Sequence, residues 1–236
     1  MFIFPAMHIP DGFLSPLVAV IFWVLSVIVI IIALGRVNRE LGEREVPVMG
    51  VLAAAIFAGQ MLNFTVARGT SGHLMGAALA SILLGPWAAV LVMTSVVSIQ
   101  ALIFQDGGLL ALGANLFNMA VIGVSVSYFV FTSVRRLVGA AAWGLLTAGA
   151  LAAWCSVFAA SLSCALQLAV SGTSPANVAV PAMAGIHTLI GGGEALITLG
   201  ALTFLLASRR DLVAGGQAPP SGGRSVWVAG LGIALF

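Results

Sequence analysis

The residues of this chain that could do chemistry begin with His8, which directly follows Met7. An α-amine, the backbone nitrogen of the next residue and the Nδ1 atom of a histidine there can close two fused chelate rings on one metal ion. Such nitrogen donors suit Ni(II), Cu(II) or Co(II) in planar or tetragonal geometry. The chelate requires Met7 to be the mature N-terminus, so we expect residues 1–6 to be an extension before that start. From residue type alone, an exposed loop histidine is the commoner case.

Two further histidines are candidates. His73 follows a glycine-bearing loop, where we expect it to begin a helix. His187 and Glu194 are seven residues apart, which places them on one helix face about 10 Å apart along the axis. An ionisable residue inside an apolar span is costly and is a functional candidate by default. For His187 and Glu194, a polar pair that packs structurally and a proton relay both remain open.

Polar residues near the histidines could support a metal site. A ligating imidazole usually passes its other N–H to a carboxylate, carbonyl or amide. Five residues are candidates for this supporting role: Asp11, Asn63, Ser71, Gln105 and Asp106. Each could instead be a helix cap or a turn residue. For Asp11 and Asp106, both followed by glycine, the turn is as good an interpretation.

The composition predicts an all-α, polytopic helical membrane protein. Of 236 residues, 61% are hydrophobic and only 7% are charged, which no ordinary soluble domain matches. We expect one transmembrane domain over residues 7–210. A flexible tail over 211–236, rich in Gly, Ala and Pro with a short apolar end, would follow it. The chain has no lysine, no basic patch that would suit nucleic acid and no G-x-x-x-x-G-K-[ST] loop for ATP.

The apolar runs predict about seven transmembrane helices. The predicted spans are 17–34, 47–66, 73–84, 86–104, 109–134, 138–170 and 181–207. If the short third segment crosses the membrane, the loops with most arginines share one face, which is cytoplasmic by the positive-inside rule. The N-terminus is then extracytoplasmic, and the candidate site residues from four separate loops converge on that face.

Three stretches resemble a known family. They are MHIPDGFLSP at residues 7–16, NF at 63–64 with GTSGHLMG at 69–76, and FQDGGL at 104–109 with GAN at 113–115 and NM at 118–119. These motifs are similar to those of the substrate-binding membrane subunit (S component) of energy-coupling-factor cobalt/nickel transporters of the cobalamin-biosynthesis type. The similarity extends from Met7 to about Arg210.

The resemblance implies a function and a ligand set. It implies metal ligation by Met7, His8 and His73, with transported Co(II) or Ni(II) as the only bound ion and no cofactor. It also implies a bacterial cytoplasmic membrane location and partner subunits: a transmembrane coupling subunit, two ATP-binding cassette ATPases and, in many systems, a small accessory membrane protein. Met1 to Ala6 departs from the family pattern, because it turns the amine of Met7 into an amide.

Two other functions remain as alternatives at this stage. A membrane metalloenzyme would need three protein ligands and a placed general base, and no H-E-x-x-H motif is present. A proton-coupled metal carrier would need several buried acids near mid-membrane, for which Glu194 alone is thin support. The residue types do not decide between cobalt and nickel, since both accept nitrogen ligands; the resemblance favours cobalt.

Overall fold

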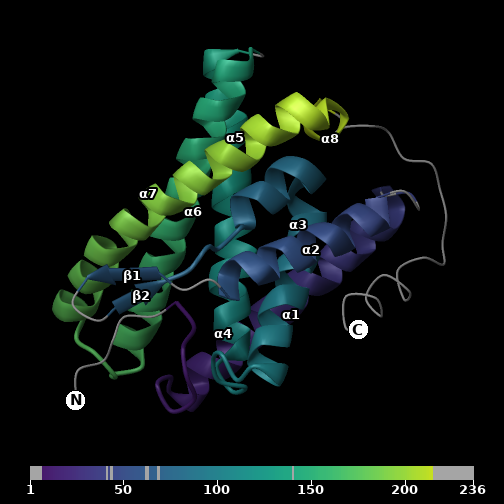
Figure 1. Ribbon diagram of the computed structural model, residues 1–236. Helices are drawn as coiled ribbons and strands as arrows, with labels where there is room; N and C mark the ends of the chain where they lie inside the picture. The colour runs from purple at the N-terminus through teal and green to yellow at the C-terminus, as the bar shows by residue number, and fades with distance from the viewer. Residues whose placement is uncertain are drawn as a thin grey trace.

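The chain forms a bundle of long helices with one short hairpin (Figure 1). The computed structural model describes residues 7–40, 42, 45–61, 64–67, 70–139 and 141–214. In chain order, its elements are α1 (Pro16–Glu40), α2 (Glu45–Met61), β1 (Phe64–Ala67), β2 (Thr70–Gly72), α3 (Ala77–Ile103), α4 (Leu112–Leu116), the π-helical η1 (Phe117–Ile122), α5 (Gly123–Val138), α6 (Ala142–Val170), α7 (Ala176–Ser208) and α8 (Arg210–Ala214).

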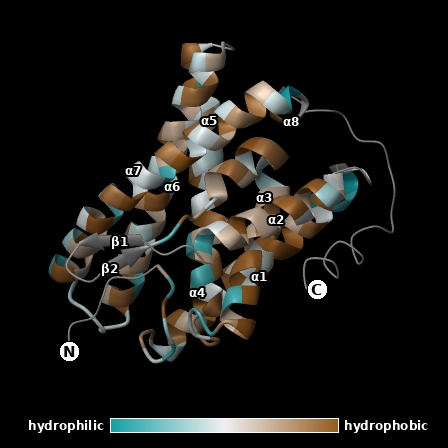
Figure 2. Ribbon diagram, in the orientation of Figure 1, coloured by the Kyte–Doolittle hydropathy of each residue, from teal (hydrophilic) through white to brown (hydrophobic). Residues whose placement is uncertain are grey.

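The described part of the chain contains five helices long and apolar enough to cross a membrane. They are α1, α3, α6, α7 and the continuous run of α4, η1 and α5. Large apolar side chains are exposed along them, as on α1, where Leu17 is 70% and Ile31 62% exposed. Figure 2 shows this apolar character along the helices. Such a surface suits lipid, and the predicted all-α, multi-pass membrane fold is confirmed.

Local signals explain where the first helix begins. Pro10-Asp11-Gly12 makes the predicted turn, with Gly12 in the left-handed region at φ 86°. The Ser15 hydroxyl then accepts a hydrogen bond from the N–H of Val18 at 3.4 Å, and Pro16 is the first helical residue. Proline suits that position because its missing N–H would have no partner there.

The predicted break in the third apolar region is confirmed. Gly85 has non-helical angles inside α3 (φ 77°, ψ 171°), and Pro86 begins the second helical segment. The start of α3 is different from the prediction, since the helix begins at Ala77 and His73 lies in the extended segment before it. The count of seven crossings and the extracytoplasmic N-terminus stay predictions.

Two other predicted boundaries were wrong, and the first residues of the expected tail are helical. Residues 64–66, expected at the end of the second span, belong to β1, which pairs antiparallel with β2. Helix α7 begins at Ala176, ahead of Pro181, which is tolerated within the helix. Residues 211–214 of the expected flexible tail form part of α8, and residues 215–236 lie outside the described part of the chain.

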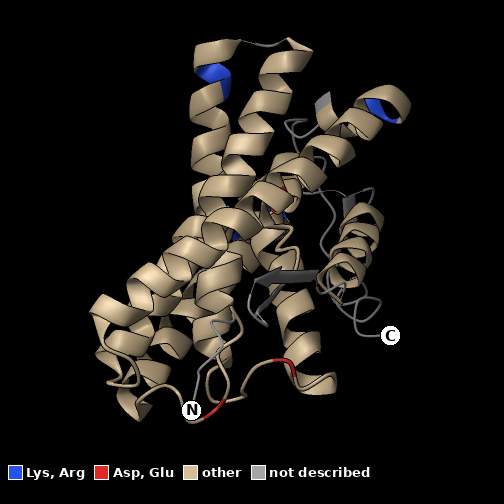
Figure 3. Cartoon of the chain, turned by 60° about the vertical axis from the view of Figure 1, so that its left-hand side comes forward, with Lys and Arg blue, Asp and Glu red and all other residues tan. Residues whose placement is uncertain are grey.

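The charges separate along the bundle. Figure 3 shows basic residues at the upper ends of helices and acidic residues on loops at the opposite end, with further charged residues of both signs midway. Arg135 and Arg136 lie in the last turn of α5, whereas α4, which begins the same continuous run, lies at the lower end (Figure 1). The candidate site is at this lower end.

Candidate metal site

The N-terminal segment is fixed to α4 by an asparagine that acts like a neighbouring strand. The Ile9 N–H donates to Oδ1 of Asn115 at 2.8 Å, and Nδ2 of Asn115 donates back to the Ile9 carbonyl at 3.1 Å. Gly108 N–H donates to the same carbonyl at 2.9 Å. Asn115 is fully buried, so these bonds hold the backbone next to His8 in one position.

Asp11 anchors the same segment to the loop before α4. Its carboxylate accepts three backbone N–H bonds, from Leu109 at 3.0 Å, Leu110 at 2.8 Å and Ala111 at 3.1 Å. A side chain on Gly108 would overlap this carboxylate. Asp11 therefore organises the turn, which is the alternative that the sequence left open; its described bonds do not reach an imidazole.

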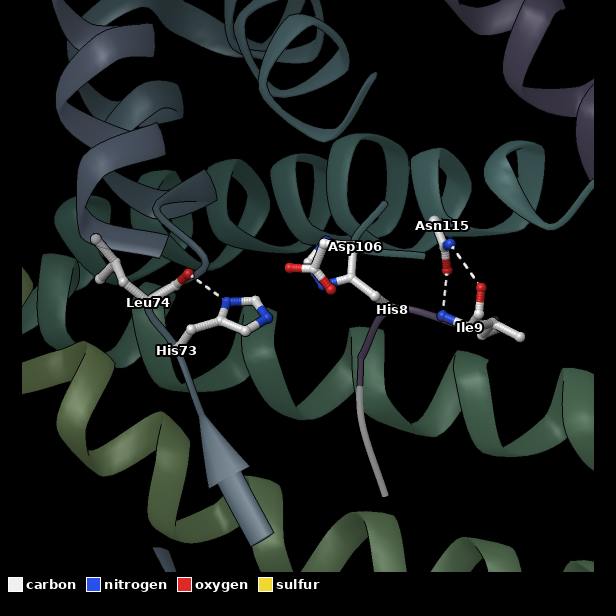
Figure 4. Close-up of polar contacts among 6 residues, drawn as sticks. All are labelled: His8, Ile9, His73, Leu74, Asp106 and Asn115. Carbon is white, nitrogen blue, oxygen red and sulfur yellow. Dashed lines mark hydrogen bonds and ion pairs between the residues drawn. The ribbon is translucent and has the colours of Figure 1, made fainter. Parts of the chain in front are cut away.

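His8 and His73 lie against each other at the centre of the site. Their ring centroids are 5.0 Å apart, with planes 29° from parallel. The Nδ1 of His73 donates to the carbonyl of Leu74 at 2.8 Å, so Nε2 carries the lone pair when the ring is neutral. Figure 4 shows this nitrogen on the side of the ring that faces His8. The two predicted histidine ligands are thus brought together, from segments 65 residues apart.

Burial keeps His8 neutral. The pKa of His8 is lowered to about 4, chiefly by desolvation on burial and secondly by the neighbouring His73, while Asp106 and Gln100 oppose the shift. The Nδ1 of His8 is 3.6 Å from Oδ1 of Asp106, whose side chain is 40% exposed. At neutral pH the His8 ring therefore has a lone pair available, which ligation of a metal requires.

The remaining predicted supporting residues have different outcomes. Asp106 borders His8, as expected. Gln105 is exposed at φ 56°, and no hydrogen bond within the described residues joins it to either histidine. Ser71 pairs through its backbone with Thr65 in the hairpin, while the side chain of Ser71 and the whole of Asn63 lie outside the description.

Glu194 and His187 do not hydrogen-bond to each other. Glu194 is 1% exposed and accepts the N–H groups of Met75 and Gly76, both at 2.7 Å. His187 donates from Nδ1 to the carbonyl of Met183 at 2.9 Å. Glu194 therefore fixes the segment that carries His73, and the expected polar pair between the two residues is not formed.

Three amide side chains near the site were not predicted as site residues: Gln60, Gln100 and Asn115. Gln60 is buried and donates to the Met75 carbonyl at 2.6 Å, opposite the bonds from Glu194. Gln100 is fully buried and lies near His8. An amide side chain within an apolar stretch was the signal that could have identified these residues, because polar groups inside membrane helices are often functional.

Side chains alone do not complete a metal site among the described residues. No group of three or more His, Cys, Asp or Glu side chains is arranged there to hold an ion. Two imidazole rings with centroids 5.0 Å apart can nevertheless supply two nitrogen donors, and further donors would have to come from the backbone or from an amine.

The architecture defines a helical membrane protein in which two histidine rings stack against each other near the N-terminal segment. Residues 8–212 match the family model described as the cobalt uptake substrate-specific transmembrane region. The chain belongs to this family and is a membrane component of cobalt/nickel uptake, a transport subunit rather than an enzyme.

Individual relatives agree with this assignment. A protein of Haloquadratum walsbyi, provisionally named for metal transport, is 44% identical over 88% of this chain and 93% of its own length. The fused nickel transport protein of Rhodobacter capsulatus is 34% identical over 96% of this chain and 70% of its length. The crystal structure of a truncated transition metal transporter superimposes with a TM-score of 0.77 at 35% identity, over 85% of this chain and 98% of the other.

Proposed function

We propose that this chain captures Co(II) or Ni(II) between His8 and His73, at the extracytoplasmic face, as the substrate-binding subunit of an energy-coupling-factor transporter. The observation that carries the proposal is the stacking of these two rings at 5.0 Å. His8 is neutral at physiological pH because of its burial, and Nε2 of His73 has its lone pair on the side of His8. Asp106, half-exposed beside His8, adds a negative charge that attracts a cation.

The proposed ligands are four nitrogens. They are the α-amine of Met7, the backbone nitrogen and Nδ1 of His8, and Nε2 of His73. A set of this kind favours Ni(II) and Co(II) in planar or tetragonal geometry. It agrees with the absence of a three-side-chain metal group among the described residues. Met7 is 7% exposed and precedes the segment held by Asn115, so its position is well defined.

Energy for transport comes from other subunits in this proposal. The chain has no lysine and no phosphate-binding loop of the G-x-x-x-x-G-K-[ST] type, whose lysine contacts the nucleotide phosphates. Two ATPases and a transmembrane coupling subunit, with a small accessory membrane protein in some systems, would complete the transporter. The cargo metal would be the only ion bound, with no resident cofactor.

Substitution of His73 tests the proposal. The His73→Ala variant should lose tight Ni(II) and Co(II) binding, by more than the ~10–100-fold that loss of an outer partner costs. Its fold should persist, because the ring lies in an extended segment outside the helices. The matched control is His187→Ala, which removes the histidine of α7 and should keep the metal stoichiometry. Metal content and calorimetric affinity of the purified proteins give the result; an unchanged stoichiometry in His73→Ala would exclude His73 as a ligand.

A further inference from the structure

Gln100 has a fully buried side-chain amide that has no hydrogen-bond partner among the described residues. It lies in the last turn of α3, where its backbone carbonyl accepts the N–H groups of Phe104 at 3.1 Å and Asp106 at 3.0 Å. Its side chain is 0% exposed. Neither Oε1 nor Nε2 of this side chain has a hydrogen-bond partner within the described structure. The backbone carbonyl of Gln100 is therefore hydrogen-bonded, whereas its side-chain amide is not.

Such a side chain is unfavourable for stability. A buried polar group without a partner loses its bonds to water and gains none, whereas an apolar residue of similar size would avoid that loss. Leucine is common elsewhere in this chain and would fill the same volume. An amide retained at this position therefore indicates a role in another state of the protein.

His8, which lies next to Gln100, also has a polar atom without a hydrogen-bond partner. Nε2 of His8 is buried and has no hydrogen-bond partner in the described structure either. The Gln100 side chain lies within hydrogen-bonding reach of the His8 ring, but no hydrogen bond of good geometry joins them within the described structure. Nδ1, on the other side of the ring, is the atom near Asp106, at 3.6 Å. The loop that carries Asp106 is attached to the backbone of Gln100, because the Asp106 N–H donates to the Gln100 carbonyl.

We propose that Gln100 is the positioning residue that sets the tautomer and orientation of the His8 ring in the metal-bound state. This inference rests on the proposed function. A neutral imidazole has one N–H, so a metal on Nδ1 requires the proton on Nε2. Oε1 of Gln100 accepts that proton in a hydrogen bond, as outer partners of ligating histidines do. Metal capture thereby satisfies both buried groups at once.

The inference predicts opposite effects on stability and on binding. In Gln100→Leu, the apo protein should unfold at the same or a higher temperature, because an unpaired amide is removed. The Kd for Ni(II) should rise about 10–100-fold, and the ligand-field absorption of the bound Ni(II) should change. Gln100→Glu keeps an oxygen acceptor and should restore the wild-type Kd to within about threefold, because the His8 proton still has its partner.

Gln167→Leu is the matched control. Gln167 is a buried glutamine on α6 whose amide exchanges two hydrogen bonds with Asn118, at 2.9 and 2.7 Å. Its replacement should lower the unfolding temperature by a few degrees, because Asn118 loses both bonds to Gln167 and keeps only the one from Ser163, and should leave the Ni(II) Kd unchanged.

The possible results distinguish a failure of the role of Gln100 from a failure of the proposed function. If His73→Ala abolishes Ni(II) binding while Gln100→Leu binds with wild-type affinity and spectrum, the proposed function stands and the role of Gln100 is wrong. If Gln100→Leu lowers the unfolding temperature as Gln167→Leu does, or Gln100→Glu fails to restore binding, Gln100 has a packing role only. If the wild-type protein binds no Ni(II), the proposed function fails and this inference fails with it.

Discussion

Two side chains, those of Asn115 and Asp11, hold the segment around His8 in place by hydrogen bonds to main-chain groups. Asn115 takes both hydrogen-bonding groups of Ile9, and Asp11 takes three consecutive N–H groups before α4. A terminal segment would otherwise be poorly ordered. These bonds place Met7 and His8 at a buried position, so that a nitrogen of the main chain can act as a metal ligand with little ordering cost on binding.

The amine of Met7 provides a prediction at this scale. A chain that begins at Met7 should bind Ni(II) more tightly, by at least about tenfold, than one in which residues 1–6 precede it. The reason is that an amide nitrogen ligates only after the metal displaces its proton, and a preceding residue 6 would require this of two amide nitrogens, those of Met7 and His8, instead of one. Calorimetry on the two forms, with mass spectrometry of their N-termini, measures the difference.

Acetylation of the shorter form is the control for the amine. It removes the basic nitrogen without adding an apolar arm, and it should weaken binding to the level of the longer chain. Full affinity in protein whose terminus is Met1 would show that the amine is dispensable and that His8 and His73 recruit other donors.

At the residue level, the sequence indicated the two histidines that lie together but not most of the residues that hold them in place. His8 and His73 were identified from their motifs, and the structure places their rings together. Asn115 and Gln100 were not predicted as site residues because their roles depend on segments about 90 to 106 residues away. The turn at Asp11 was expected, but its three hydrogen bonds to the loop before α4 were not.

Among the elements, α7 and α2 determine where His73 lies. Glu194 on α7 binds the amides of Met75 and Gly76, and Gln60 on α2 binds the Met75 carbonyl. Gly76 has φ 78°, and a side chain there would collide with Ile56. These contacts end the extended segment and delay the start of α3 until Ala77. The predicted helix start at His73 was wrong for this reason, since no local signal reports a carboxylate 119 residues away.

Glu194→Gln tests this connection between helices. An amide offers one acceptor in place of two, so one buried N–H loses its partner, at about 1–3 kcal/mol. The unfolding temperature should fall, and the Ni(II) affinity should fall as well, because the segment that carries His73 is released. Thermal unfolding of the apo protein and calorimetry measure the two effects.

The matched control lies one turn further along α7. Thr198 is fully buried, and its hydroxyl has no hydrogen-bond partner in the described structure. Thr198→Val removes no bond and should leave both stability and affinity unchanged or slightly raise stability. Wild-type stability and affinity in Glu194→Gln would mean that Glu194 does not hold the segment.

Proline and glycine in the sequence correctly predicted where some helices begin or break. Ser15-Pro16 begins α1 and Gly85-Pro86 interrupts α3, as predicted, because proline and glycine act on their own backbone. The π-helical turn of η1 was not predicted. Asn118 within this turn donates to Gln167 on α6, a tertiary contact that local sequence does not report.

The whole molecule has opposite charges at its two ends. The acidic loops and the paired histidines lie at the end where α4 begins, and Arg135 and Arg136 lie at the end of α5 (Figures 1 and 3). The run from Leu112 to Val138 has 27 residues, or about 40 Å of helix, which exceeds the roughly 30 Å of a bilayer core. It is therefore long enough to place its ends on opposite faces of a membrane.

The positive-inside rule orients the molecule and gives the last prediction. With Cys155 and Cys164 replaced, a cysteine at the exposed position of Gln105 should react with a membrane-impermeant maleimide in intact cells. A cysteine at the exposed position of Arg136 should react only after the cells are permeabilised. The two positions flank the same helical run, so each serves as the control for the other. Labelling of position 136 from outside intact cells would invert the orientation, and the paired histidines would then face the cytoplasm, where they could not capture metal for uptake.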